Sequence, residues 1–329
     1  MSAKIAKITN LEEMSGYDTL ELATVFNWKV AVKKGEHKIG DLVIYFGIGS
    51  ILPLSDETKF LYVGNNNGRL KTRKFRDYIS QGLVGPLSWL PSHNNLVEET
   101  DVTELMRVTK YIPEEEKVVY EAGTTRGKWP NGFPKTDEER AQYCLKHLRK
   151  HMNSNIIITK KYDGTSTTFA YQNNIFKVLS RNNHLLEETK ENSLYFEMAR
   201  KYNIEEGMKL LGRNIAIQGE TVGPKINGNR MKMKNNDFFV FNIYDIDAGQ
   251  YLYDVTQICN QLGLKTVDII YHGPIIEEKH LNMEWLLDFA DQQTYDSGAI
   301  CEGIVIKTDS GPRFSCKVIS NKYILKYNL

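Results

Sequence analysis

Residues 155–172 read NIIITKKYDGTSTTFAYQ, two β-branched and aromatic runs on either side of the tetrapeptide KYDG at 161–164. Runs of this composition bounded by turn residues predict strands, so KYDG is expected where one strand turns into the next. The amine of Lys161, held at a strand end, can act as a nucleophile when a nearby cation lowers its pKa. Lys160 or a bound metal ion could supply that charge. Because KxDG alone is common by chance, the interpretation depends on the sequence that follows.

Five further segments follow KYDG in order, and each lies in or at the end of a predicted strand. Most of them place a charged side chain at a strand end, and one is a strongly aromatic strand. They are SRN at 180–182, QGE at 218–220, FFVFNI at 238–243, EGIVIK at 302–307 and FSCKVIS at 314–320.

This ordered set resembles motifs I, Ia, III, IIIa, IV and V of the covalent nucleotidyltransferase superfamily, which includes ATP-dependent ligases and mRNA capping enzymes. GETVGPKINGN at 219–229, together with VFNI at 240–243, looks more like RNA ligases than DNA ligases. KTDEERAQ at 135–142, SQGL at 80–83 and VTKY at 108–111 are similar to RNA ligases of the Deinococcus and Naegleria type, which carry an OB domain ahead of the catalytic domain.

The resemblance implies an ATP-dependent RNA ligase that joins a 3′-hydroxyl to a 5′-phosphate in three steps. Each step is an in-line displacement at phosphorus, so the protein supplies positioning and charge neutralisation. Lys161 is the implied nucleophile that becomes lysyl-AMP, and Lys317 and Glu302 complete the implied catalytic group. The implied nucleotide contacts are Arg181 to the ribose or a phosphate, Phe241 stacked on adenine, Lys307, Lys317 at the α-phosphate, Glu220, and Arg140 at the ATP phosphates.

Asp163, Glu220 and Glu302 are acidic groups at strand ends, and as a set they could hold a hydrated Mg²⁺ or Mn²⁺ ion. By resemblance, Glu220 could instead bind the ribose hydroxyls. Two of the implied nucleotide contacts could instead have a structural role. Arg181 could form a surface ion pair, and Phe241 could be a core residue.

The last motif departs from the family pattern. Many members have two lysines there, spaced Lys-x-Lys, but here Ser315 occupies the first position and only Lys317 remains. The roles of Lys307 and Lys317 could therefore be shared differently in this chain. Only 12 residues follow Lys317, so we do not expect the carboxy-terminal OB domain that DNA ligases and capping enzymes carry.

The chain as a whole predicts an α+β protein of 329 residues with two domains. Residues 1–105 contain several short strands and no long helix, which is typical of a five-stranded OB-type barrel. Residues 106–135 have linker composition, and 136–329 form the expected nucleotidyltransferase domain of antiparallel sheets and helices. A helix capped by Thr136 or Asp137 should open that domain. Another helical stretch is expected at about 193–211.

The net charge of +1 argues against a protein that binds polyanions by bulk charge, but it leaves room for a local basic groove. Residues 69–76 contain five cations, expected on a barrel strand, where they could contact nucleic acid or ATP phosphates. A solvated edge strand is the alternative. Residues 1–105 as a whole contain 12 Lys and Arg against 13 Asp and Glu, so the barrel itself is not basic.

No apolar run approaches the ~20 residues of a membrane-spanning helix, and the amino terminus lacks the apolar core of a secretory signal. The protein is therefore expected to be intracellular and cytoplasmic, with no membrane partner, and to act as a monomer. Its expected substrate is a nick in duplex RNA or an RNA–DNA duplex. Three alternatives remain open: an mRNA guanylyltransferase, a DNA ligase, and an inactive OB-type RNA-binding protein.

Overall fold

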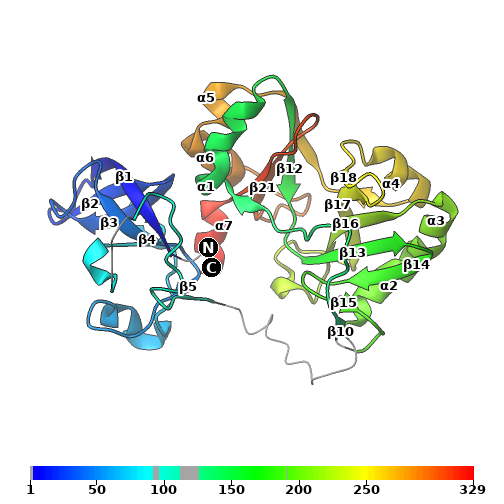
Figure 1. Ribbon diagram of the computed structural model, residues 1–329, viewed down its shortest axis with the longest axis horizontal. Coiled ribbons are helices and arrows are strands. Elements are labelled where there is room, and N and C mark those ends of the chain that lie inside the picture. Colours follow the sequence, from blue (N-terminus) through cyan, green and yellow to red (C-terminus); the bar gives the residue numbers. More distant parts are fainter. Residues whose placement is uncertain (1–2, 92–95, 112–125, 191) are drawn as a thin grey trace. The chain divides into compact units, whose positions relative to one another are not determined.

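The structure, a computed structural model, describes residues 3–91, 96–111, 126–190 and 192–329. The chain divides into two units, which Figure 1 shows in sequence colours. Unit 1 contains Met1–Tyr120 together with Ile324–Leu329, and unit 2 contains Glu121–Tyr323. The predicted linker, 106–135, falls partly on residues 112–125, which lie outside the described residues.

Unit 1 is built on a five-stranded antiparallel sheet in the order β3-β2-β1-β4-β8. The sheet curls toward closure, because the Gln81 amide next to β8 donates to the Lys29 carbonyl of β3 at 2.8 Å. This nearly closed barrel confirms the predicted OB-type fold. The strands are β1 Ala3–Glu13, β2 Leu20–Val25, β3 Trp28–Lys33, β4 Leu42–Phe46 and β8 Leu83–Gly85.

The basic residues 69–76 do not lie on a barrel strand, so that expectation is wrong. β6 (Arg73–Phe75) pairs with β7 (Tyr78–Ser80), and together they form a separate two-stranded sheet. The Arg69 guanidinium lies 3.5 Å from the ring centroid of Tyr111. The remaining short elements of unit 1 are β5 Ser50–Ile51, which pairs with β9 Thr109–Lys110, and the 3-10 helices η1 Lys59–Tyr62, η2 Gly64–Asn66 and η3 Leu87–Trp89.

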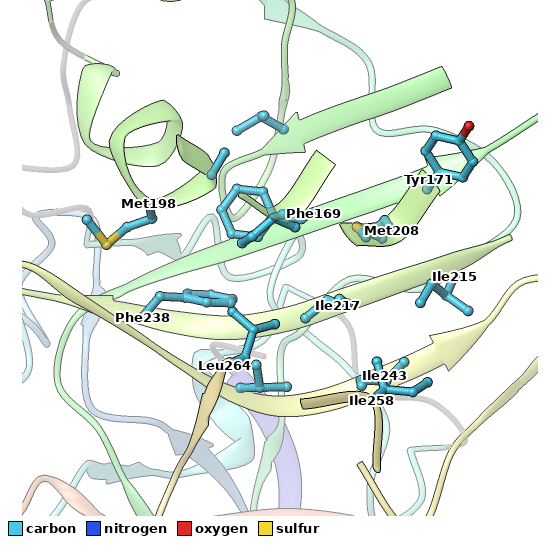
Figure 2. Packing of buried hydrophobic residues seen from close by; sticks show 14 of the residues in the cluster. Phe169, Tyr171, Met198, Met208, Ile215, Ile217, Phe238, Ile243, Ile258 and Leu264 are labelled. Atoms are coloured by element: carbon cyan, nitrogen blue, oxygen red, sulfur yellow. The ribbon is translucent and has the colours of Figure 1, made fainter. Parts of the chain in front are cut away.

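Unit 2 contains a larger sheet of eight strands in the order β10-β15-β14-β13-β16-β17-β18, with β19 pairing in parallel with β17. Apolar side chains of this sheet pack against three helices, and Figure 2 shows Phe169, Met198 and Phe238 in that core. The strands are β10 Arg126–Gly127, β13 Thr165–Gln172, β14 Ile175–Leu179, β15 His184–Leu185, β16 Ile215–Val222, β17 Asp237–Asp245, β18 Gln250–Tyr251 and β19 Lys265–Thr266. The helices are α2 Ser193–Lys201, α3 Ile204–Leu211 and α4 Thr256–Leu262.

The second sheet of unit 2 has five strands in the order β11-β22-β21-β12-β20, antiparallel except for the β11–β22 pair. Its buried face packs against α1 and α6. The strands are β11 Glu139–Arg140, β12 Asn155–Lys161, β20 Ile269–Pro274, β21 Gly303–Thr308 and β22 Ser315–Ile319. The remaining helical elements of the chain are α1 Ala141–Leu148, η5 Arg149–His151, η6 Asn227–Asn229 between β16 and β17, α5 Glu277–His280, α6 Met283–Asp291 and α7 Asn321–Tyr327, which belongs to unit 1 from Ile324 onward.

Two predicted helices differ from the structure. The first begins at Ala141 and not near Thr136, because Glu139 and Arg140 pair with β22 as a strand. The stretch at 193–211 forms two helices, since the chain turns at Asn203, whose φ of 47° lies in the left-handed region. Within the described residues, no helix is both long and apolar enough to cross a membrane.

Candidate active site

The KYDG segment does not join two strands of one hairpin, because it carries the chain from one sheet of unit 2 to the other. β12 ends at Lys161 in the five-stranded sheet, and β13 begins at Thr165 in the eight-stranded sheet. Lys161 is therefore fixed at the edge where the two sheets meet, and its register partner on β21 is Gly303.

A carboxylate from the neighbouring strand meets the Lys161 amine. Lys161 Nζ lies 2.7 Å from Glu302 Oε2, and both side chains are largely buried. The Tyr295 hydroxyl ties the two residues together, since it donates to the Lys161 carbonyl at 2.7 Å and accepts from the Glu302 amide at 3.0 Å. The amine and the carboxylate are thus positioned by their backbones as well as by their own ion pair.

The surroundings of Lys161 are acidic. Burial disfavours its charge, but Glu302, Glu220 and Asp163 outweigh burial and raise the pKa of Lys161 above its ordinary value. Lys160 does not lower that pKa, because its ammonium is paired with Asp268 at 2.8 Å. The expectation that Lys160 activates its neighbour is therefore wrong, and Lys161 is held as an ammonium ion.

The other two predicted metal ligands also face this site. Burial and the nearby negative charge of Glu302 raise the pKa of Asp163, while burial raises the pKa of Glu220 to about 8. Asp163 Oδ1 accepts from Asn227 Nδ2 at 2.8 Å, and Asp163 Oδ2 accepts from the Tyr323 hydroxyl. Glu220 Oε1 accepts from the Gly164 amide at 3.2 Å.

Among the described residues, no three His, Cys, Asp or Glu side chains are grouped so that they could hold a metal ion by themselves. The oxygen donors nevertheless suit Mg²⁺ or Mn²⁺, which take few carboxylates and keep several waters. The Lys161 ammonium already shows that a cation is held beside Glu302. Glu302 and Glu220 fit this role better than Asp163, because both Asp163 oxygens are engaged by protein donors.

Lys317 and Arg140 form a positive counterpart to the acidic group. They face each other in register on β22 and β11. Burial, together with the positive charges of Lys161 and Arg140, lowers the pKa of Lys317 to about 8. Within the described part of the chain, the Lys317 ammonium makes no ion pair or hydrogen bond. This arrangement suits the binding of an anion such as a phosphate group.

Lys307 is engaged differently from Lys317. Its ammonium donates to the Phe241 carbonyl at 2.7 Å and to Asn242 Oδ1 at 2.8 Å, and burial lowers its pKa to about 8. These bonds connect β21 to β17 and fix the strand that carries the half-buried Phe241 ring. The two lysines of the last two motifs therefore have distinct surroundings.

Arg181 makes a two-point contact with Asp137, whose Oδ1 accepts from Arg181 Nε at 3.1 Å and from Nη2 at 2.7 Å. Arg181 therefore forms a surface ion pair, which was the structural alternative given for this residue from sequence. Its predicted role toward the ribose or a phosphate stays a prediction.

Three residues that were not predicted from the sequence hold Lys161, Glu302 and Asp163 in place, namely Tyr295, Tyr323 and Asn227. Tyr323 lies 160 positions from Asp163 in the chain, so no local pattern links them. Asn227 offered a better signal, because it lies in the segment GETVGPKINGN, which had already been singled out.

Two motif glycines leave no space for a side chain. A Cβ on Gly164 would lie 2.2 Å from the Thr221 carbonyl oxygen, and one on Gly303 would lie 2.0 Å from the Val318 carbonyl oxygen. Both glycines are needed because a neighbouring strand of the site passes close to the backbone.

Two family models match parts of this chain. The family described as RNA ligase matches residues 154–327, and an OB-fold domain matches residues 2–87. A search of curated protein sequences gives no match.

Several solved structures of Naegleria gruberi RNA ligase are similar to the whole chain. A lysine-to-methionine variant with AMP and Mn is 32% identical with a TM-score of 0.87, and the alignment covers 98% of each chain. A glutamate-to-alanine variant with ATP and Mn is 32% identical with a TM-score of 0.88, covering 99% of each chain. A structure with PPi is 32% identical with a TM-score of 0.88, covering 99% of this chain and 98% of that chain.

The family match spans more than half of the chain, and the structural relatives exceed 30% identity over nearly all of it. The chain therefore belongs to the RNA ligase family.

Proposed function

We propose that this protein uses ATP and a divalent cation, Mg²⁺ or Mn²⁺, to seal 3′-hydroxyl and 5′-phosphate ends at nicks in duplex RNA or in RNA–DNA duplexes. The observation that carries the proposal is the Lys161 amine, 2.7 Å from Glu302 and close to Lys317, in a chain of the RNA ligase family. ATP and Mn also appear together in related RNA ligase structures.

In the first step, neutral Lys161 Nζ attacks the α-phosphorus of ATP, an N–P bond forms, and the P–O bond to pyrophosphate breaks. The ammonium must first lose a proton, and Glu302 Oε2 is close enough to accept it. Lys317 and Arg140 stabilise negative charge on the phosphates as pyrophosphate leaves. A divalent cation held by Glu302 and Glu220 would neutralise phosphate charge.

In the second step, an oxygen of the RNA 5′-phosphate attacks the phosphorus of lysyl-AMP, and the N–P bond to Lys161 breaks. In the third step, the RNA 3′-hydroxyl attacks the activated 5′-phosphate, loses its proton, and displaces AMP. Lys317 keeps a positive charge near the reacting phosphates in each step. We infer that the protein carries out this cycle as a monomer.

Labelling with α-³²P-ATP tests the first step. Wild-type protein should retain the label, Lys161→Ala should lose it, and the neighbouring Lys160→Ala should keep it, because Lys160 is paired with Asp268 outside the reacting group. Retained label in Lys161→Ala would remove Lys161 as the nucleophile. Labelling by GTP in place of ATP would favour a guanylyltransferase.

A panel of nicks tests the substrate. We expect the protein to seal nicks with RNA on both sides or RNA paired with DNA, and to seal an all-DNA nick more slowly. Equal sealing of the all-DNA nick would contradict the proposed preference. Analytical ultracentrifugation of the active protein checks the monomer.

A further inference from the structure

A polar pocket of about 490 Å³ lies where the loop 223–236, between β16 and β17, begins and ends. Lysines and amides dominate its lining, and it lies entirely within unit 2. The residues that matter here are Lys201, Lys225, Lys234, Asn235, Asn236 and Glu197.

Two of the lysines have no counter-charge among the residues that the structure describes. Lys201 is paired with Asp237 at 3.0 Å, and the Glu197 carboxylate accepts from Asn236 Nδ2 at 3.2 Å. Lys225 and Lys234 are exposed, and neither ammonium makes an ion pair or hydrogen bond with any residue that the structure describes. The pocket therefore has an excess of positive charge that favours an anion.

The same loop reaches the active site between these two lysines. Asn227, two residues after Lys225, donates to Asp163, and Arg230 Nη1 lies 3.7 Å from Asp163 Oδ2. The Cα atoms of Lys225 and Asn227 are at most about 7 Å apart, which is the reach of two extended residues. The loop that lines the pocket therefore also supplies a residue to the reacting centre.

We propose that this pocket binds backbone phosphates of the RNA strand whose end is being joined. Ammonium and amide groups suit phosphate oxygens. Its described lining residues include no aromatic ring, so it offers no platform for stacking a base. Contacts there should therefore be independent of RNA sequence. The inference rests on the proposed function, because it assigns a contact to that substrate.

The test is the double variant Lys225→Gln, Lys234→Gln, with a fluorescein-labelled nicked RNA duplex as the probe. The matched control is Lys150→Gln, Lys209→Gln, which removes two exposed lysines from η5 and α3. Fluorescence anisotropy at several salt concentrations gives the Kd and its salt dependence. Labelling with α-³²P-ATP, without RNA, measures the first step separately.

We expect the pocket variant to weaken RNA binding by between about twofold and about thirtyfold, the range for two exposed ion pairs. The slope of log Kd against log salt should fall by about 1 for each lysine. Labelling by ATP should equal that of wild type, because neither lysine is among the proposed nucleotide contacts. The control variant should match wild type in every measurement.

A pocket variant with the Kd and salt slope of the control would overturn the phosphate site while leaving the ligase proposal intact. A pocket variant that loses ATP labelling as strongly as it loses RNA binding would also overturn the phosphate site. In that case the two lysines would affect nucleotide binding or folding. Wild-type protein that binds no RNA would overturn the proposed function as well as the pocket assignment.

Discussion

Lys161 and Lys317 flank the same strand, yet their surroundings have opposite charge. Lys161 on β12 pairs with Gly303 of β21, and Lys317 on β22 pairs with Val305, two residues further along. Carboxylates raise the pKa of Lys161, whereas burial and two cations lower the pKa of Lys317 to about 8.

This contrast indicates that the two motif lysines have different roles. Lys161 is the proposed nucleophile, and Lys317 is proposed to attract phosphate. The acidic side keeps the nucleophile charged and unreactive until its counter-ions are drawn elsewhere. The basic side, which consists of Lys317 and Arg140, carries two positive charges that can attract a polyphosphate. A bound nucleotide would compensate the positive charge near Lys317, and a divalent cation would compensate the negative charge near Lys161. Five predictions test this comparison, and the first has the largest expected effect.

Removing the positive charge of Lys317 should nearly abolish the first chemical step, the transfer of AMP to the protein. Lys317→Met is expected to lower the rate of AMP transfer to the protein by about 10²–10³-fold, the usual loss when one preorganised charge donor is removed. Single-turnover labelling with α-³²P-ATP measures the rate, and Lys150→Met is the control. A rate within about twofold of wild type would remove Lys317 from the reacting group.

The same substitution should change stability in opposite directions at the two positions. Lys161→Met leaves the largely buried Glu302 carboxylate without its cation, so the free energy of unfolding should fall by about 2 kcal/mol at pH 7. Lys317→Met removes a charge that burial disfavours, so unfolding should cost about 1–2 kcal/mol more. Urea denaturation followed by tryptophan fluorescence measures both changes.

The sign of the Lys317 effect also has a pH dependence. Because its folded pKa, about 8, lies below its unfolded value, the unfolded chain binds more protons between these two values. The wild-type protein should therefore gain stability relative to Lys317→Met as the pH rises above about 8. Destabilisation by both substitutions at pH 7 would contradict the opposite-charge interpretation.

Chemical acylation should distinguish the two amines directly. At pH 8 about half of the Lys317 amines are neutral, whereas Lys161 remains protonated, so Lys317 should react about a hundredfold faster with a small acylating reagent. Peptide mass spectrometry after brief exposure to acetic anhydride measures the ratio. Faster acylation of Lys161 would mean that the carboxylates do not hold its proton.

Tyr295 is a positioning residue on the acidic side, and its removal should have the smallest effect. Tyr295→Phe deletes the two hydrogen bonds that join Lys161 to Glu302, and the AMP-transfer rate should fall about 3–10-fold with an unchanged KM for ATP. Tyr271→Phe removes a comparable hydroxyl, which donates to the Pro274 carbonyl at 2.6 Å. Equal kinetics in both variants would assign Tyr295 a purely structural role.

The strands of both units could be predicted from sequence because their β-branched and aromatic runs are local signals. The pairing of those strands could not. Nothing in NIIITKKYDGTSTTFAYQ indicates that its two strands belong to different sheets, since each finds its partners far away in the chain. Glu139 and Arg140 illustrate the same point, because pairing with β22 overrides the predicted helix start.

The candidate site was predicted as a set of residues but not as a balance of charges. Lys161, Glu302, Glu220 and Asp163 do face one another, as motif order suggested. The pKa of the Lys161 amine depends on how many charged groups lie near it and on their sign. The positions of these groups in space are not given by the sequence. From sequence, Lys160 and a bound metal ion were both possible sources of the activating charge, but the Lys160 side chain is paired with Asp268.

The close approach of strands at Gly164 and Gly303 has a consequence for mutational scanning of this enzyme. Neither position carries a reactive group, yet alanine at either one would force two strands of the site apart. A screen that records only survival would rank these positions beside the nucleophile. Pairing the screen with a measure of soluble protein would separate residues that react from residues that merely make room.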